Sequence, residues 1–209
     1  MIKNILFDLG GVLMDLDVPK TIQALNHIGI NDIVNNTGHE YKHPFFYEFE
    51  RGNISETIFL IELSNLSKQN NNLLRIKRAW NEMILNITEE KVDLLKKLKP
   101  NYNLFLLSNT NAIHQRKFLN NFNNRYGYSL NKLFKKAYYS HEIRKRKPDI
   151  DTYKYVLQDA KIKANETLFI DDSSTNLNEA YKCGINIFQA RNNNLPEIFD
   201  LLKTFEEEN

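Results

Sequence analysis

Cysteine is almost absent from this 209-residue sequence, with Cys183 as its only example. A single thiol excludes an intramolecular disulfide and any metal site built from several cysteines. Long apolar runs are missing too. No stretch approaches the ~20 apolar residues of a membrane helix, and the N-terminal apolar run is too short for a signal peptide and contains Asp8. We therefore expect a cytoplasmic protein without a membrane partner.

An excess of charge of either sign is also lacking. Lys and Arg number 28 and Asp and Glu number 26, which leaves a formal net charge of +2. This balance gives no global attraction to nucleic acids or anionic membranes. The dense basic loop at 144–147 has no interleaved aromatic residues and no extended basic face, so we expect no nucleic-acid partner. We expect a monomer or a weak homodimer.

The stretch from Asn4 to Leu13 is the most informative one present. Its apolar residues 5–7 predict a strand buried on both faces, which ends at Asp8 and is followed by Gly10 and Gly11. Ligands of open α/β sheets bind beyond the carboxyl ends of the strands, so Asp8 is a candidate nucleophile. Taken alone, the stretch favours the alternative that Asp8 caps a turn after an ordinary strand, so later segments have to decide.

A helical region follows this strand directly. Amphipathic helices are predicted at 20–27, 55–66 and 73–85, with no convincing strand among them. The region is rich in aromatic residues, most of which we assign to packing. Helices inserted after a first strand suggest a cap, so we divide the chain into a core of residues 1–15 and 86–209 and a cap of residues 16–85.

Strands and helices alternate through the rest of the chain. Strands are predicted at 103–107, 134–139, 167–170 and 186–189. Helices are predicted at 88–99, 112–122, 175–183 and 195–205, with another one opening at Asp149. This alternation is typical of an α/β fold with a Rossmann-like, doubly wound parallel sheet.

Polar groups follow four of the predicted strands. They are Asp8, then Ser108 with Asn109, then the basic loop that carries Lys147, and finally Asp171 with Asp172. Three carboxylates at one sheet edge would repel one another without a cation, and hard oxygen ligands suit Mg²⁺. A lysine and a hydroxyl beside a metal suit a phosphoryl group, which an aspartate can attack to give an acyl phosphate.

These residues resemble the motifs of the haloacid dehalogenase-like (HAD) hydrolases, over nearly the whole chain. The motifs appear in order as Phe7-Asp8-Leu9-Gly10-Gly11-Val12-Leu13, Leu107-Ser108-Asn109-Thr110-Asn111, Arg146-Lys147-Pro148-Asp149 and Phe169-Ile170-Asp171-Asp172. The segment Phe49-Glu50-Arg51-Gly52-Asn53-Ile54-Ser55 is similar to the helical-cap phosphatases of that family. Those include bacterial enzymes that act on sugar phosphates such as glucose 1-phosphate.

The resemblance implies a role for each matching residue. Asp8 would be the nucleophile and a metal ligand, and Ser108 with the backbone at Asn109 would hold the phosphate. Lys147 would neutralise the charge of phosphate and aspartate. Asp172 would bind Mg²⁺ directly, together with the carbonyl of Gly10. Asp171 would be a nearby ligand or the partner that orients Lys147.

One position departs from the family pattern. Most phosphatases of this family have a second aspartate two residues after the nucleophile, which serves as general acid and base, and here that residue is Gly10. Losing such a group typically costs ~100-fold to 10,000-fold in rate. The protein could favour good leaving groups, recruit another acid such as Asp15 or a cap residue, or bind ligands without turnover.

Magnesium-dependent hydrolysis of a small phosphorylated metabolite is the function that the sequence favours. A haloacid dehalogenase also starts from an aspartate and lacks the second one, but it uses no metal, and the Asp171-Asp172 pair is poorly suited to an anionic haloacid. The other alternative is a non-catalytic protein that binds a phosphorylated ligand. In the basic loop we expect Lys147 to turn inward and Arg144, Lys145 and Arg146 to be solvated.

Overall fold

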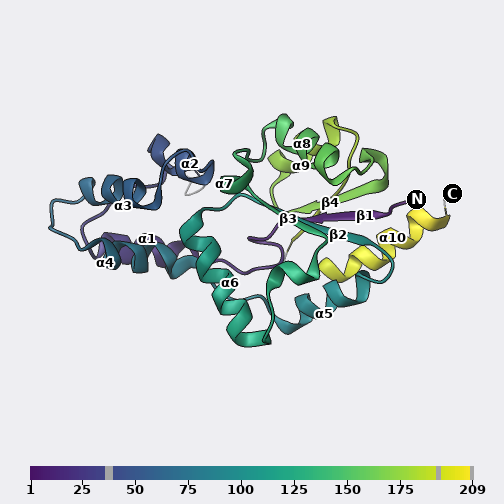
Figure 1. Ribbon diagram of the computed structural model, residues 1–209, viewed down its shortest axis with the longest axis horizontal. Coiled ribbons are helices and arrows are strands. Elements are labelled where there is room, and N and C mark those ends of the chain that lie inside the picture. Colours follow the sequence, from purple (N-terminus) through teal and green to yellow (C-terminus); the bar gives the residue numbers. More distant parts are fainter. Residues whose placement is uncertain (36–39, 192–193, 208–209) are drawn as a thin grey trace.

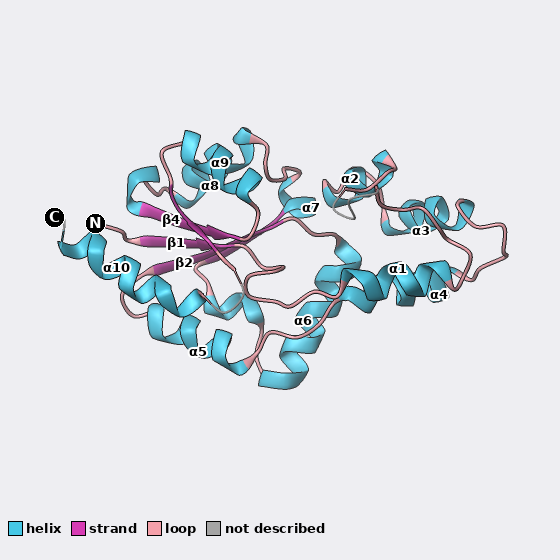
Figure 2. Cartoon of the chain, turned by 180° about the vertical axis from the view of Figure 1, so that it is seen from behind, coloured by secondary structure: helices cyan, strands magenta, loops and turns pink. Residues whose placement is uncertain are grey.

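The computed structural model describes residues 1–35, 40–191 and 194–207, and its centre is a parallel sheet (Figures 1 and 2). The five strands lie in the order β3-β2-β1-β4-β5, all parallel. They are β1 Asn4–Phe7, β2 Asn103–Ser108, β3 Lys136–Tyr139, β4 Thr167–Asp171 and β5 Asn186–Gln189. The predicted Rossmann-like sheet is therefore confirmed, with β1 at its centre.

Helices cover both faces of the sheet. One face carries α5 Glu89–Leu98, α6 Ala112–Tyr126 and α10 Ile198–Glu207, and the other carries α8 Ile150–Ala160 and α9 Ser174–Lys182 (Figure 1). Alternate strand residues supply the two cores: Ile5 and Phe7 pack with the first group, and Leu6 packs with the second. Burial on both faces explains why the strands read as continuous apolar runs.

Among the described residues, four helices lie between β1 and α5, and they extend away from the sheet (Figure 1). They are α1 Val18–Asn26, α2 Pro44–Glu50, α3 Glu56–Asn65 and α4 Leu73–Trp80. Their shared core is aromatic, with Phe46, Phe59 and Trp80 at centroid separations of 5.1 to 5.6 Å. The aromatic residues of this region thus mainly serve packing, as the sequence predicted.

Several short elements connect the longer ones within the described residues. They are the one-turn helix α7 Ser140–Ile143 and the 3₁₀ turns η1 Asn81–Met83, η2 Leu130–Leu133, η3 Ala164–Glu166 and η4 Leu195–Glu197. Among the described residues, no helix is long and apolar enough to cross a membrane.

Several predicted boundaries were wrong. The helix expected to reach residue 85 ends at Trp80, because Ile84 instead forms a bridge with Leu16 where the chain re-enters the core. The helix expected to end at 122 continues to Tyr126, where Gly127, at a φ of +77°, closes it. The third strand begins at Lys136 rather than Phe134, because η2 ends at Leu133 and the next two residues form a bend that leads into the strand. The last helix is divided between η4 and α10.

Candidate active site

Asp8 and Asp171 lie side by side where two adjacent strands end. Phe7 of β1 is in register with Ile170 of β4, and the Asp8 N–H donates to the Ile170 carbonyl at 2.8 Å. The two aspartates that follow these residues are therefore level with each other at the carboxyl edge of the sheet. Asp8 is 8% exposed and Asp171 is fully buried.

Lys147 joins the two carboxylates. Its Nζ lies 2.7 Å from Oδ1 of Asp8 and 2.6 Å from Oδ2 of Asp171, and its side chain is 1% exposed. Burial alone would lower the pKa of this ammonium group, but the two carboxylates outweigh burial and raise the pKa above its ordinary value. Lys147 therefore stays charged, and it turns inward as the sequence predicted.

Asp172 completes a cluster of three carboxylates. Asp8, Asp171 and Asp172 each place an oxygen within 4.8 Å of the others. With all three ionised, the single ammonium of Lys147 leaves a net charge of about −2. Burial raises the pKa of Asp8 to about 7, with Lys147 opposing the shift and Asp171 adding to it. Asp8 thus lies where a divalent cation would relieve unfavourable charge, and this set of oxygen ligands fits Mg²⁺.

The two neighbouring aspartates differ in their surroundings. Asp171 accepts hydrogen bonds from the Ser173 N–H at 2.8 Å and from the Asn176 side chain at 3.0 and 3.1 Å, in addition to its contact with Lys147. Asp172 is exposed at the rim. A side chain at Gly11 would overlap the Asp172 carboxylate, with its Cβ 2.9 Å from Cγ, so the loop after β1 passes close against this group.

Asn109 contacts Lys147 through its side chain. Its Nδ2 donates to the Lys147 carbonyl at 2.8 Å, and the Lys147 N–H donates to its Oδ1 at 2.9 Å. The sequence suggested only that the Asn109 backbone holds phosphate, so this bracing of the lysine was missed. Ser108 is buried at the end of β2, the strand beside β1. The phosphate contacts of Ser108 and Asn109 stay predictions.

The motif residues match a family model for haloacid dehalogenase-like hydrolases over residues 5–190. The chain belongs to this family. A D-ribitol-5-phosphate phosphatase from Bacteroides thetaiotaomicron is 31% identical over 192 residues, which cover 92% of this chain and 93% of that enzyme.

Solved structures agree with this family membership. A wild-type HAD family enzyme from Bacteroides thetaiotaomicron, in complex with magnesium and inorganic phosphate, has a TM-score of 0.84 and 34% identity, covering 92% of this chain and 96% of that one. A 2-haloacid dehalogenase from Pseudomonas syringae has a TM-score of 0.63 at 16% identity, covering 98% of this chain and 100% of that one. The latter similarity shows the shared fold only.

The space beside Gly10, where most HAD phosphatases carry the second aspartate, is occupied by an apolar side chain. A Cβ on Gly10 would lie 2.8 Å from Cδ1 of Leu16. Leu16 is 39% exposed and forms a bridge with Ile84. This HAD hydrolase therefore has an aliphatic group near the position of the usual acid.

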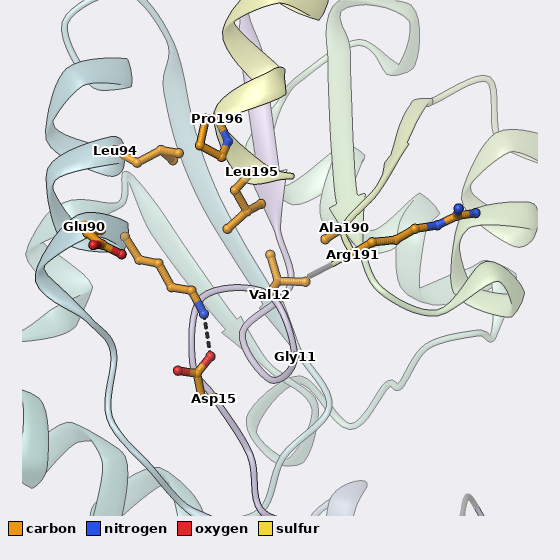
Figure 3. A pocket seen from close by; sticks show the side chains of 10 residues that line it. Gly11, Val12, Asp15, Glu90, Leu94, Ala190, Arg191, Leu195 and Pro196 are labelled. Carbon is orange, nitrogen blue, oxygen red and sulfur yellow. Dashed lines mark hydrogen bonds and ion pairs between the residues drawn. The ribbon is translucent and has the colours of Figure 1, made fainter. Parts of the chain in front are cut away.

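Asp15, one candidate for a replacement acid, is already paired. Its Oδ1 lies 2.6 Å from Nζ of Lys91, in a cavity of about 260 Å³ beside the loop after β1 (Figure 3). The lining residues are Gly11, Val12, Asp15, Glu90, Lys91, Leu94, Ala190, Arg191, Leu195 and Pro196. Asp8, Lys147 and Asp171 are not among them, so this cavity lies next to the carboxylate cluster rather than over it.

The prediction that Arg146 is solvated was wrong. Its guanidinium forms an ion pair with Glu50 of α2 at 3.0 Å, and its side chain is only 19% exposed. Arg144 is exposed, as predicted.

Two polar residues near the site, Asn176 and Ser140, were not identified from the sequence. The Ser140 hydroxyl accepts a hydrogen bond from the Thr110 N–H and donates one to the Thr110 carbonyl, both at 2.9 Å. Asn176 could have been recognised from the sequence, because it is a polar residue in the first turn of the helix that follows the Asp171-Asp172 pair.

Proposed function

We propose that this HAD hydrolase is a magnesium-dependent phosphatase that hydrolyses a small phosphomonoester, namely a sugar phosphate, through an aspartyl phosphate on Asp8. The observation that carries the proposal is the buried ammonium of Lys147 between Asp8 and Asp171, with Asp172 beside them. The D-ribitol-5-phosphate phosphatase, at 31% identity, supports a sugar phosphate as substrate.

The substrate class in this proposal is therefore the sugar phosphates, and the reacting group is their phosphoryl group. Mg²⁺ would be held by Asp8, Asp172 and the carbonyl of Gly10, with Asp171 nearby, and when bound it would neutralise charge on the phosphoryl oxygens. The fit rests on the cluster of three carboxylates, which carries more negative charge than Lys147 can balance.

The residues of the chain would divide the chemistry between them. A carboxylate oxygen of Asp8 attacks phosphorus, the bond from phosphorus to the ester oxygen breaks, and the leaving group departs with a proton from solvent. Lys147 lies 2.7 Å from Asp8 and is placed to neutralise the charge that builds up on the phosphoryl oxygens. Ser108 and the backbone at Asn109 would hold those oxygens. Water then attacks phosphorus, which releases inorganic phosphate and restores Asp8.

We also propose that residues 1–15 and 86–209 are the catalytic core and that residues 16–85 are a cap that shields the intermediate. The bridge between Leu16 and Ile84 supports this division, because it joins the two connecting segments at the point where the chain leaves and re-enters the core. A cytoplasmic protein, present as a monomer or a weak homodimer and without nucleic-acid or membrane partners, is part of the same proposal. The near-neutral net charge of +2 supports the absence of nucleic-acid and anionic-membrane partners.

Hydrolysis of a panel of phosphate esters tests this function. The panel contains an activated aryl phosphate, pentitol and pentose phosphates and hexose phosphates, each measured with Mg²⁺ and with a chelator. Turnover that requires Mg²⁺ and favours sugar or sugar-alcohol phosphates is the expected result. Binding of inorganic phosphate without turnover of any ester would instead favour the non-catalytic alternative, to which Gly10 points.

A further inference from the structure

The loop that carries Lys147 is held from outside the core by the end of α2. On one side of the lysine, Nε and Nη2 of Arg146 contact Oε2 of Glu50 at 3.1 and 3.0 Å. The Arg146 guanidinium also lies 4.9 Å from the ring centroid of Tyr47, one turn earlier in α2. The side chains of Arg146 and Glu50 are only 19% and 13% exposed. A pair this sheltered is screened less by solvent than an ordinary surface ion pair.

The residue that directly follows α2 holds the loop on the other side of the lysine. Arg51 forms an ion pair with Asp149 at 2.7 Å, two residues after Lys147. The backbones also approach closely here, because a side chain on Gly52 would overlap the carbonyl oxygen of His141. Two consecutive residues of the insertion, Glu50 and Arg51, therefore contact the two residues that flank Lys147 and Pro148.

We propose that Glu50 and Arg51 are positioning residues, which hold Lys147 in place for the phosphoryl group through Arg146 and Asp149. This inference rests on the proposed function and extends it. Asn109 holds the Lys147 backbone from the core, and the two ion pairs hold the adjacent residues from the insertion. The affinity of the core for phosphate thus depends on the docked position of α2.

The physical reason is the geometry required of the Lys147 side chain. Its Nζ has to reach Asp8 and Asp171 at once, at 2.7 and 2.6 Å, so its backbone has little freedom to move. A misplacement of about 1 Å of a catalytic group can cost on the order of 100-fold in rate. The carboxylates of Asp8 and Asp172 come from other loops, and Mg²⁺ binding should therefore depend far less on Glu50.

The test compares Glu50→Leu with the control Glu56→Leu. Glu56 also lies in the insertion and also pairs with a core residue, Arg116 of α6, but it does not contact the loop of Lys147. The affinity for inorganic phosphate in saturating Mg²⁺ and the affinity for Mg²⁺ alone are measured by calorimetry. Hydrolysis of the ester panel is measured on the same samples.

Glu50→Leu is expected to weaken phosphate binding ~10-fold or more and to lower kcat, with the Mg²⁺ affinity unchanged. Glu56→Leu should change neither affinity. Glu50→Gln keeps a hydrogen-bond acceptor for Arg146 and should restore part of the loss. Arg51→Leu, at the more exposed pair, provides a second reading in case Glu50→Leu does not fold.

Phosphate affinity and kcat equal to those of the wild type in both Glu50→Leu and Arg51→Leu would overturn the inference. Equal losses of Mg²⁺ and phosphate affinity would also overturn it, because they indicate general damage to the fold. Failure of the proposed function is a separate result: it requires that the wild type itself turn over no ester. A wild type that neither turns over esters nor binds phosphate overturns both.

Discussion

The side-chain amide of Asn109 forms hydrogen bonds with both main-chain polar groups of Lys147, donating to the carbonyl at 2.8 Å and accepting from the N–H at 2.9 Å. We predict that Asn109→Ala lowers kcat/KM for phosphate esters by ~10-fold to 100-fold, because the Lys147 backbone loses its contact with the core. Steady-state kinetics measure this change.

Asn111→Ala is the matched control for this prediction. The Asn111 side chain also forms two backbone hydrogen bonds, with the N–H groups of Ile113 and His114, but these cap α6 and do not contact Lys147. This variant should lose ~1 kcal/mol of unfolding free energy and keep most of its kcat/KM. Equal kinetic losses in the two variants would contradict the assigned role of Asn109.

Asp171 and Asp172 should respond differently to removal of their carboxylates. Asp171→Ala leaves the fully buried ammonium of Lys147 with one partner fewer and is expected to lower the free energy of unfolding by ~3–5 kcal/mol. Asp172→Ala removes an exposed group and should cost less than ~1 kcal/mol, but it should weaken Mg²⁺ binding by at least ~10-fold. Urea unfolding and Mg²⁺ titration separate the two effects. An unchanged Mg²⁺ affinity in Asp172→Ala would exclude it as a ligand.

A side chain at Gly11 should disturb the Mg²⁺ site as well as strain the backbone, because it would overlap the Asp172 carboxylate. Gly11 and Gly127 have nearly the same φ, +76° and +77°, so Ala costs ~1–2 kcal/mol of backbone strain at either position. Only at Gly11 would the added Cβ overlap Asp172; at Gly127 no atom lies within 4 Å. We predict that Gly11→Ala weakens Mg²⁺ binding and that Gly127→Ala does not. Calorimetric titration of the two variants with Mg²⁺ measures the difference.

Mg²⁺ affinity should rise with pH up to about pH 7. Burial raises the pKa of Asp8 in the metal-free protein to about 7, despite the opposing effect of Lys147, so below that pH a proton occupies the carboxylate that the cation needs. For one competing proton the affinity falls ~10-fold for each pH unit below the pKa and is level above it. Mg²⁺ titrations between pH 5.5 and 8.5 measure the slope. Asp8→Asn should flatten it, and an unchanged slope in that variant would assign the proton to another group.

The strand ends could be predicted from the sequence, because parallel strands place the residues after them along one edge of the sheet. Asp8, Lys147 and Asp171 were brought together in this way, and their apolar runs made the strands easy to recognise. The segment 44–50 did not stand out as a separate helix. Its clustered aromatic residues hide the period of an amphipathic helix, although Phe46 and Phe49 are its buried positions.

The contacts that brace Lys147 could not be predicted in the same way. Glu50 and Arg146 are 96 residues apart, and their pairing depends on how the insertion docks against the core. In the sequence, Arg146 is one of several basic residues in a loop, and such residues are usually solvated. Asn109 likewise gave no sign that its side chain, rather than its backbone, would have a specific partner.

The role of Asp8 as the nucleophile of a Mg²⁺-dependent phosphatase is tested by comparing the wild type with Asp8→Asn on the best ester of the panel. The two side chains have nearly the same shape, so the substitution removes the carboxylate nucleophile while keeping the volume. We predict Mg²⁺-dependent turnover in the wild type, a loss of at least ~1,000-fold in Asp8→Asn, and a phosphoryl group on Asp8 in acid-quenched wild-type protein. Wild-type rates in Asp8→Asn would show that Asp8 is not the nucleophile.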